Sequence, residues 1–240
     1  MPPNDLSQRA TCLNTRFARA QAVGLLHSAL MEKQFGKAAL VSSFGTEAVV
    51  LLHMVSLIRP DTPVLFIDTE MLFPETLDYQ RRLSARLGLT DVRLLRADAQ
   101  QLAAADPTGT LHQSAPDTCC ALRKTAPLLK GLKSFDAWIS GRKRFQGGKR
   151  EALELFEPEP GTGRIKLNPL ANWSSADITA YISTNNLPPH PLIARGYGSV
   201  GCAPCTAPGQ GRSGRWQGST KTECGIHFDT GQALRTGANT

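Results

Sequence analysis

The alternation of short buried strands with helices constrains this chain more than any other feature. Apolar runs at 38–41, 64–67 and 92–95 predict three strands, and the segments 47–57 and 74–87 between them predict helices. Helical crossovers join parallel strands, so this order favours a parallel sheet. We therefore expect an α/β fold in which a parallel, twisted sheet carries helices on both faces.

Further elements are predicted before and after these strands. They are a helix over 14–35, a loop over 105–118, a helix over 120–132, a strand over 137–140, short strands over 153–156 and 164–167, and a helix over 174–184. Beyond residue 188 the chain is rich in Gly and Pro, and we expect mostly irregular structure there.

The composition fits one globular domain with an ample core. The chain has 240 residues, of which 41% are hydrophobic and 20% charged. No apolar run approaches the roughly 20 residues that span a bilayer. The N-terminus lacks the basic and apolar regions of a secretory signal. We expect a cytoplasmic protein whose cysteines act as ligands or catalysts rather than forming structural disulfides.

The net charge of +7 suggests an acidic partner. Basic side chains are concentrated in a few short clusters that are not interleaved with aromatic residues, namely Arg142-Lys143-Arg144, Lys149-Arg150, and Arg212 with Arg215. Such clusters suit a small ligand bearing phosphate and sulfate better than nucleic acid or a membrane. The alternatives are a solvated basic surface or a zinc-stabilised RNA-binding protein.

The first strand–loop–helix junction predicts an anion site. Ser42, Ser43, Gly45 and Thr46 supply hydroxyls and close backbone approach, and the following helix offers free N–H groups. The spacing is equally compatible with an ordinary turn, since the Gly-Lys-Ser/Thr ending of a Walker loop is missing. Asp68-Thr69 ends the next strand and is expected at the same edge of the sheet.

Four cysteines have the spacing of a metal site. Cys119-Cys120 and Cys202-x-x-Cys205 could provide four thiolates for Zn²⁺ or for an iron–sulfur cluster. Adjacent cysteines diverge too much for a compact tetrahedral ion, which favours a [4Fe-4S] cluster. The alternatives are structural zinc and four unrelated free thiols.

Cys224 lies beyond the last predicted helix or strand, where it can pack little. Nearby cations or His227 could give it thiolate character, which a nucleophile needs. An incidental surface cysteine is the competing interpretation. Cys12 has no partner nearby in sequence and is interpreted as a spare thiol.

Taken in order, these motifs resemble the assimilatory adenylylsulfate/phosphoadenylylsulfate reductases. The resemblance runs from about residue 38 to 228. It rests on the segments 42–47, 66–69 and 72–76, on Cys119-Cys120 with Arg123-Lys124, on Gly141-Arg142-Lys143-Arg144, on Cys202-x-x-Cys205, on Arg212-x-x-Arg215-Trp216 and on Glu223-Cys224-Gly225-Ile226-His227.

The resemblance implies an adenine-nucleotide α-hydrolase-like (Rossmann-like) fold and three segments. These are an N-terminal helical segment 1–37, a nucleotide-binding reductase domain 38–208 with the cluster loops, and a flexible catalytic tail 209–240. The implied reaction reduces an adenylylated sulfate to sulfite, with thioredoxin or glutaredoxin as reductant. Its intermediate is an S-sulfocysteine on Cys224.

The resemblance also implies the role of each site residue. Cys224, His227 and Lys124 would be catalytic, and Cys119, Cys120, Cys202 and Cys205 would hold one cluster per chain. Substrate would contact Ser42, Ser43, Gly45, Thr46, Asp68, Thr69, Gly141, Arg142, Arg212 and Arg215. The cluster would hold the loops and tune the electrostatics of the pocket without carrying electrons.

The cysteines imply the substrate, because the branch of the family that has all four mostly uses adenylyl sulfate. The Ser-Ser-Phe-Gly-Thr loop departs from the form common in that branch, and Lys143, Arg144 or Lys149 could accommodate a 3′-phosphate. A phosphoadenylyl sulfate reductase or a dual-specificity enzyme is therefore the alternative. An ATP-dependent sulfurylase subunit or tRNA thiolation enzyme would need a Ser-Gly-Gly-x-Asp-Ser loop, which the sequence lacks. A homo-oligomer is compatible with the resemblance; nucleic-acid and membrane partners are not expected.

Overall fold

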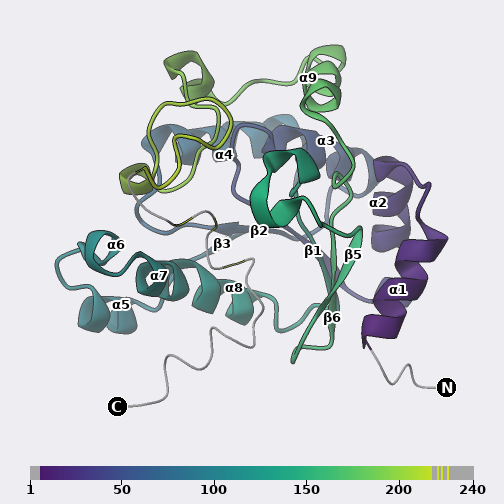
Figure 1. Ribbon diagram of the computed structural model, residues 1–240, viewed down its shortest axis with the longest axis horizontal. Helices are drawn as coiled ribbons and strands as arrows, with labels where there is room; N and C mark the ends of the chain where they lie inside the picture. Colours follow the sequence, from purple (N-terminus) through teal and green to yellow (C-terminus); the bar gives the residue numbers. More distant parts are fainter. Residues whose placement is uncertain (1–5, 218–220, 222, 224–225, 227–240) are drawn as a thin grey trace.

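The fold is a mostly parallel six-stranded sheet between two layers of helices (Figure 1). The computed structural model describes residues 6–217, 221, 223 and 226. The sheet order is β3-β2-β1-β4-β6-β5. The strands are β1 (Ala38–Ser42), β2 (Val64–Ile67), β3 (Val92–Leu95), β4 (Ala137–Ile139), β5 (Phe156–Glu159) and β6 (Arg164–Leu167). The predicted α/β class is confirmed.

The strand order reverses direction between β1 and β4. Chain order runs outward from β1 through β2 to β3, and β4 then pairs with the other side of β1, Ala39 opposite Trp138. All these pairs are parallel, whereas β5 is antiparallel to β6 at the edge. In an open parallel sheet, ligands bind at the carboxyl ends of the strands where the order reverses. The topology thus places a crevice after Ser42 and Ile139.

Alternate side chains of β1 face different helix layers, as the two-residue period of a strand requires. Leu40 packs into the larger apolar cluster, whereas Ala39 and Val41 pack into the smaller one with Trp138. The larger cluster includes side chains of α1 (Leu6–Arg16), α2 (Ala22–Met31), α3 (Ala48–Ile58), α4 (Pro74–Arg86) and α9 (Ser175–Thr184). The smaller cluster lies under α8 (Ala126–Gly131).

The N-terminal segment contains two helices, so the prediction of one helix over 14–35 is wrong. Helix α1 ends at Arg16, a turn follows, and α2 begins at Ala22. The break lets both helices pack on the sheet: Phe17 contacts Phe35 and Phe156, with ring centroids 6.4 and 5.4 Å away. One straight helix could not direct both apolar faces inward.

The segment between β3 and β4 is more helical than predicted. Helix α5 (Ala99–Ala105) begins at Asp98, whose carboxylate accepts the N–H groups of Gln100 and Gln101. The predicted loop over 105–118 contains α6 (Leu111–Ser114) and the start of α7 (Pro116–Cys120). Pro116 opens α7 at a position where a missing N–H costs nothing. A π-helical stretch, Ala121–Thr125, then joins α7 to α8.

The predicted boundaries of the elements after β4 agree with the structure at some positions and differ at others. Strand β5 begins at Phe156, three residues later than the predicted 153, whereas β6 lies as predicted. The start of α9 is confirmed: Ser174 Oγ accepts the N–H of Asp177, and the Asp177 carboxylate accepts the N–H of Ser174.

After α9 the described chain is mostly irregular, as expected. It has two 3₁₀ helices, Pro191–Arg195 and Ala203–Cys205, and isolated bridges that join Tyr197 to Gly209 and Thr206 to Arg215. Within the part of the chain that the structure describes, no helix is long and apolar enough to cross a membrane.

Candidate active site

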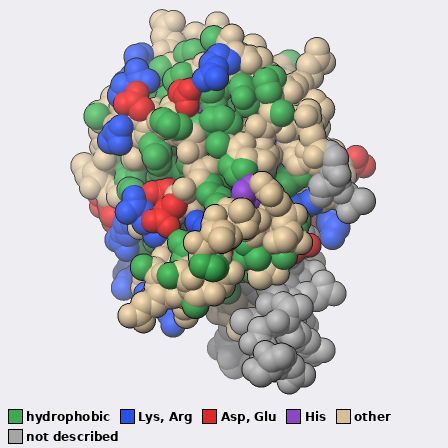
Figure 2. Space-filling model, turned by 90° about the vertical axis from the view of Figure 1, so that its left-hand side faces the viewer, with side chains coloured by type: hydrophobic (Ala, Val, Ile, Leu, Met, Phe, Trp, Pro, Cys, Tyr) green, Lys and Arg blue, Asp and Glu red, His purple; other side chains and the backbone are tan. Residues whose placement is uncertain are grey.

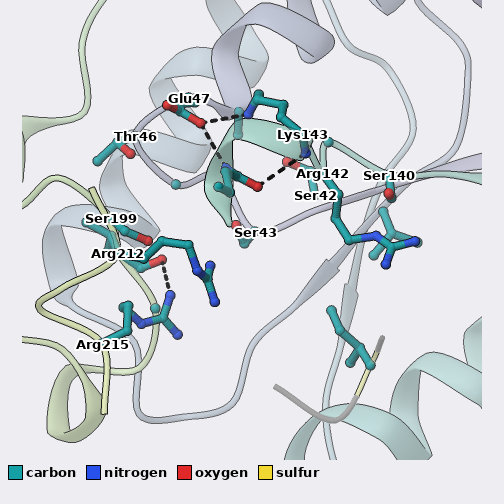
Figure 3. Close-up of a pocket in the computed structure, with 18 of the residues that line it drawn as sticks. Ser42, Ser43, Thr46, Glu47, Ser140, Arg142, Lys143, Ser199, Arg212 and Arg215 are labelled. Atoms are coloured by element: carbon teal, nitrogen blue, oxygen red, sulfur yellow. Dashed lines mark hydrogen bonds and ion pairs between the residues drawn. The ribbon is translucent and has the colours of Figure 1, made fainter. Parts of the chain in front are cut away.

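A cavity of about 320 Å³ opens at the carboxyl ends of β1 and β4, where the strand order reverses. Two walls form it. The strand wall comprises the segments after β1 and β4, 42–47 and 140–143. The coil wall comprises residues 196–217, which have neither α-helix nor named strand. In Figure 3, Arg212 and Arg215 of the coil wall lie across the cavity from Ser42 and Ser43 of the strand wall.

The first half of the strand wall is the loop 42–46. Phe44 is fully buried, has a left-handed φ of 48° and packs edge-on against Phe66, 5.1 Å between centroids. Its N–H donates to Ser42 Oγ at 3.2 Å. The buried ring fixes the loop, so Ser43, Gly45 and Thr46 line the cavity at the beginning of α3. This geometry suits an anion at a helix N-terminus.

The second half of the strand wall follows β4 and is basic. Lys143 is 3% exposed, and its ammonium donates to Glu47 Oε2 at 2.7 Å (Figure 3). Burial lowers the pKa of Lys143, and Glu47 opposes this shift. Arg142 is also buried and contacts Glu157, and burial lowers its pKa. Ser140 donates to Asn168 at 2.5 Å.

The coil wall holds two arginines against one aromatic ring. The guanidinium carbon of Arg215 lies 4.4 Å from the centroid of Trp216, and that of Arg212 lies 5.7 Å from it. A Cβ on Gly201 would lie 2.3 Å from Arg215 Nη2, so any larger residue there would shift the guanidinium group. The backbone N–H of Trp216 donates to the carbonyl oxygen of Cys205 at 3.1 Å, which ties the segment with these two arginines to the cysteine loop.

Two of the cavity's arginines have buried donors without a hydrogen-bond partner among the described residues. These are the Nε atoms of Arg142 and Arg215. A buried donor that stays unpaired is costly, and guanidinium groups bind oxyanions through paired donors. Both side chains line the cavity. The cavity is therefore built to receive an anion.

The four cysteines of the predicted metal site line one small cavity beside the first. Cys119 and Cys120 end α7, and Cys202 and Cys205 come from the coil wall. Cys202 and Lys124 line both cavities. Among the described residues, no three His, Cys, Asp or Glu side chains form a group that could hold one metal ion. Four thiols facing one space are nevertheless the donor set that iron–sulfur clusters use.

These cysteines influence one another electrostatically. Burial, together with the neighbouring Cys120 and Cys202, raises the pKa of Cys119 to about 11, although Arg123 opposes the rise. Burial also raises the pKa of Cys205. Thr69 Oγ1 lies 3.2 Å from Cys202 Sγ. The raised pKa values of Cys119 and Cys205 favour the protonated thiols, so ligation there would have to displace protons.

A buried ion pair fixes the helix that carries two of the cysteines. Arg123 donates to Asp106 Oδ2 at 2.7 Å and to Thr69 O at 3.0 Å. The Arg123 hydrogen bond lowers the pKa of Asp106. The π-helical stretch that contains Arg123 also contains Lys124. One short segment thus joins the end of β2 to both cavities.

Most of the predicted substrate residues meet at the first cavity. Its lining includes Ser42, Ser43, Gly45, Thr46, Thr69, Gly141, Arg142, Arg212 and Arg215, together with Lys124. Asp68 does not line it; its carboxylate accepts two hydrogen bonds from Arg96, at 2.9 and 2.7 Å. Cys224 and His227, both predicted to be catalytic, lie outside the described residues.

Sequence reasoning missed several residues of the site. Ser140, Glu47 and Gln146 line the cavity, and Glu223 pairs with Arg150, which was noted only as a basic residue. One signal could have identified Glu223: it is the only Asp or Glu between Asp177 and Asp229. A single acid in a long basic stretch beside a cysteine suggests a specific partner.

Basic and acidic side chains are mixed on one side of the molecule (Figure 2). On the side of the molecule shown in Figure 2, Lys and Arg side chains lie next to Asp and Glu. The ion pairs Arg82–Asp78 and Arg195–Glu75 on α4, 2.8 and 2.5 Å long, are of this kind. This mixture differs from the continuous positive stripe expected for RNA binding.

The fold and the cavity define a doubly wound α/β protein with an anion site at its switch point. Comparison with solved structures agrees. A phosphoadenylyl-sulfate (PAPS) reductase from Candida auris, solved as a phosphate complex, superposes with a TM-score of 0.72 at 29% identity, covering 83% of this chain and 97% of that one. An FMN adenylyltransferase from Candida glabrata shares the fold alone, with a TM-score of 0.55 at 16% identity, covering 87% and 68% of the two chains.

Sequence comparison gives the family. Residues 37–208 match the phosphoadenosine phosphosulfate reductase domain. An adenosine 5′-phosphosulfate reductase of Mesorhizobium japonicum is 43% identical, covering 93% of this chain and 89% of the relative. Another, from Chelativorans sp., is 41% identical over 98% of each chain. A phosphoadenosine 5′-phosphosulfate reductase of Gloeobacter violaceus is 41% identical, covering 80% of this chain and 82% of the relative. The chain belongs to the phosphoadenosine phosphosulfate reductase family, as the resemblance implied.

Proposed function

We propose that this protein reduces adenosine 5′-phosphosulfate (adenylyl sulfate) to sulfite and AMP for sulfate assimilation and cysteine biosynthesis. One observation carries the proposal: the anion cavity at the sheet's switch point borders the four-cysteine cavity through Lys124. A nucleotide fits the strand wall, and its sulfate and phosphate oxygens fit Arg212 and Arg215 of the coil wall. The two relatives named adenosine 5′-phosphosulfate reductase match over most of the chain.

The proposed chemistry runs through two displacements at sulfur. The Cys224 thiolate attacks the sulfur of the sulfate, the sulfur–oxygen bond to phosphate breaks, and AMP leaves with the electron pair. An S-sulfocysteine remains. A thiolate of thioredoxin or glutaredoxin then attacks the Cys224 sulfur, and sulfite leaves with the pair of the broken S–S bond. The second thiol of the reductant resolves the mixed disulfide, so a dithiol supplies the two electrons.

This chain's own residues hold and polarise the substrate. Arg142 and Arg215 line the cavity, where their guanidinium groups would contact the substrate's oxygens. Lys124 adds positive charge between the cavities, and His227 would stabilise the thiolate or contact phosphate. Substrate closes the cavity and excludes water, which strengthens each of these charge contacts.

We also propose that Cys119, Cys120, Cys202 and Cys205 hold one [4Fe-4S] cluster per chain. Their common cavity and all-thiol donor set support this. When bound, the cluster supplies a fixed charge beside Lys124 and ties α7 to the coil wall. Iron and acid-labile sulfide analysis of the purified protein tests the proposal: four of each per chain are expected, and stoichiometric zinc would contradict it.

The competing substrate is 3′-phosphoadenosine 5′-phosphosulfate, because the relative from Gloeobacter violaceus carries that name. The geometry favours the substrate without the 3′-phosphate. Glu47 already neutralises Lys143, and Arg144 is turned to Leu153 O and Asn172, 2.7 and 2.5 Å away, and does not line the cavity.

Side-by-side rates of sulfite release from both sulfonucleotides, with thioredoxin as reductant, test the function. We expect kcat/KM to be higher for adenylyl sulfate. A preference for the 3′-phosphorylated substrate would assign the second function, and no release from either would refute both. Because the reductants are cytoplasmic dithiols and the described cysteines are free thiols, we expect the protein to work in the cytoplasm.

A further inference from the structure

Glu223 is a buried carboxylate that two arginines of the cavity hold. Its side chain is 10% exposed, and both of its oxygens face Arg150: Oε1 contacts Nε, and Oε2 accepts from Nη2 at 2.7 Å. Arg212 Nη2 lies 3.4 Å from the same Oε2. Burial raises the pKa of Glu223, but the Arg150 hydrogen bonds and the charges of the surrounding arginines together outweigh burial, and the pKa is lower than usual. A two-point pair of this kind fixes direction as well as distance.

The pair belongs to a chain of contacts that reaches the loop 42–46. Arg150 Nη1 donates to Gln146 Oε1, and Gln146 Nε2 donates to Glu47 Oε2 at 3.1 Å. Glu47 directly follows Thr46 and also accepts from Lys143. The C-terminal segment is therefore connected, through side chains alone, to the loop that is expected to hold the nucleotide.

The two other described residues of this segment contact different sides of the site. Lys221 is paired with Asp117 on α7, the helix that carries Cys119 and Cys120. Ile226 lines the anion cavity and packs against the smaller apolar cluster. Glu223 lies between them in sequence and makes the charged contact with the strand wall's network. Lys221 thus contacts the cysteine helix, and Ile226 contacts the cavity.

We propose that Glu223 is a positioning residue: its pairing with Arg150 latches the C-terminal segment to the nucleotide-binding loop and so places Cys224 for attack. Consecutive Cα atoms are about 3.8 Å apart, so fixing Glu223 limits where its neighbour can be. Displacement of a reacting group by about 1 Å can cost 10²-fold in rate. The inference rests on the proposed function, because that function makes Cys224 the nucleophile.

The pairing also makes the latch responsive to substrate. Arg150 and Arg212 both line the cavity, so an incoming oxyanion and Glu223 contact the same guanidinium groups. Arg150 has a second partner in Gln146. Glu223 is therefore linked to the substrate's binding groups through Arg212 and to the strand wall through Arg150.

The decisive test separates binding from attack in the holoenzyme. In Glu223→Gln, we expect the single-turnover rate of S-sulfocysteine formation, followed by mass spectrometry, to fall about 10- to 100-fold. The dissociation constant for adenylyl sulfate, measured in the Cys224→Ser background, should change less than about threefold. The double variant Glu223→Gln with Arg150→Lys should be no slower than the slower single variant, because both remove one interaction.

Glu159→Gln is the matched control. Glu159 pairs with Arg164 at 2.6 Å in a similarly buried setting on β5 and β6, and neither residue lines the cavity. We expect this variant to keep the wild-type rate of intermediate formation. If Glu223→Gln fails to fold, Arg150→Lys alone tests the same pair from the other side, since it keeps the charge but not the two-point geometry.

Hydrogen exchange over residues 209–226 gives a readout that does not depend on turnover. Exchange should rise in Glu223→Gln and Arg150→Lys and stay unchanged in Glu159→Gln. An unchanged rate of intermediate formation, or equal losses in binding and rate, would overturn the latch. If the wild type reduced neither sulfonucleotide, the proposed function would fail, while unchanged exchange in Glu223→Gln would refute the latch by itself.

Discussion

The two walls of the cavity are built differently, and the difference decides which substitutions should disturb each wall. The strand wall follows β1 and β4, whose positions the parallel ladder fixes through backbone hydrogen bonds. The coil wall has isolated bridges, close glycine contacts and scattered backbone hydrogen bonds, such as that from Gly198 N–H to Gly209 O. Two of the cations that line the cavity, Arg212 and Arg215, lie on the less regular wall. Single side chains should therefore matter most there.

The largest expected effect is at the nucleophile that follows the coil wall. Cys224→Ser should lower sulfite release at least about 10³-fold, because a serine hydroxyl cannot form the S-sulfocysteine intermediate. Substrate binding should survive. Release of labelled sulfite and mass spectrometry of the protein measure both. Cys12→Ser, an exposed cysteine on α1, is the control and should behave as wild type. Label trapped covalently on the Cys224→Ser variant would contradict the assignment.

The next effect tests the geometry of the coil wall's cations. Arg215→Lys keeps the charge but loses the planar fork and its stacking on Trp216. We expect kcat/KM for adenylyl sulfate to fall about 10- to 100-fold, the equivalent of about 1.5–3 kcal/mol for hydrogen bonds to a charged group. Arg144→Lys, outside the cavity, should change kcat/KM by less than about twofold. Equal losses in both variants would remove the distinction.

A third prediction addresses the backbone of the coil wall. A Cβ on Gly214 would lie 2.0 Å from the carbonyl oxygen of Ala207, so Gly214→Ala must displace the backbone. We expect about 1–3 kcal/mol of destabilisation by urea unfolding. Gly24→Ala in α2 meets nothing within 4 Å and should stabilise by about 0.5–1 kcal/mol. The comparison between the walls would be wrong if Gly214→Ala were as harmless as Gly24→Ala.

The smallest effect concerns the base of the coil wall, where His190 is buried. Its Nδ1 accepts the N–H of Leu192 at 3.2 Å, and Nε2 lies 3.1 Å from Thr76 Oγ1, so the ring is neutral with its proton on Nε2. Burial lowers the pKa of His190 from 6.5 to about 4. Between those values the unfolded chain binds more protons, so stability is present at neutral pH and falls as pH falls.

From pH 7.5 to pH 6 this linkage should cost about 1 kcal/mol, measured as a shift of the urea midpoint. His190→Asn should be less stable overall and should lose this part of the pH dependence. An identical pH dependence in the variant would show that His190 does not carry it.

The sequence predicted the strand wall better than the coil wall. Short β-branched and apolar runs, with helices between them, determine a parallel sheet and hence where its ligands bind. The motif-based resemblance added Arg212, Arg215 and Lys124, which now lie around one cavity. Boundaries were less accurate. Helices of four or five residues, such as α6 and α7, are too short to show a 3.6-residue period.

The long-range contacts around the cavity were beyond sequence reasoning for a different reason. Arg150 and Glu223 are 73 residues apart, and nothing local pairs them. For Asp68 the predicted position, at the end of β2, was correct. What the sequence did not show is that Arg96 donates two hydrogen bonds to its carboxylate. Which polar side chain is free to meet a ligand depends on tertiary partners.

The short helix α1 has a consequence for the molecule's solubility. The Asn14 amide donates to Phe156 O and its oxygen accepts Phe156 N–H, both at 2.9 Å, so one side chain pairs with the start of β5 as another strand would. Pro158 removes a further donor from that edge. The opposite edge, β3, carries Arg93, paired with Asp91. We therefore expect truncation before residue 20, which removes Asn14 from the β5 edge, to increase aggregation measured by light scattering.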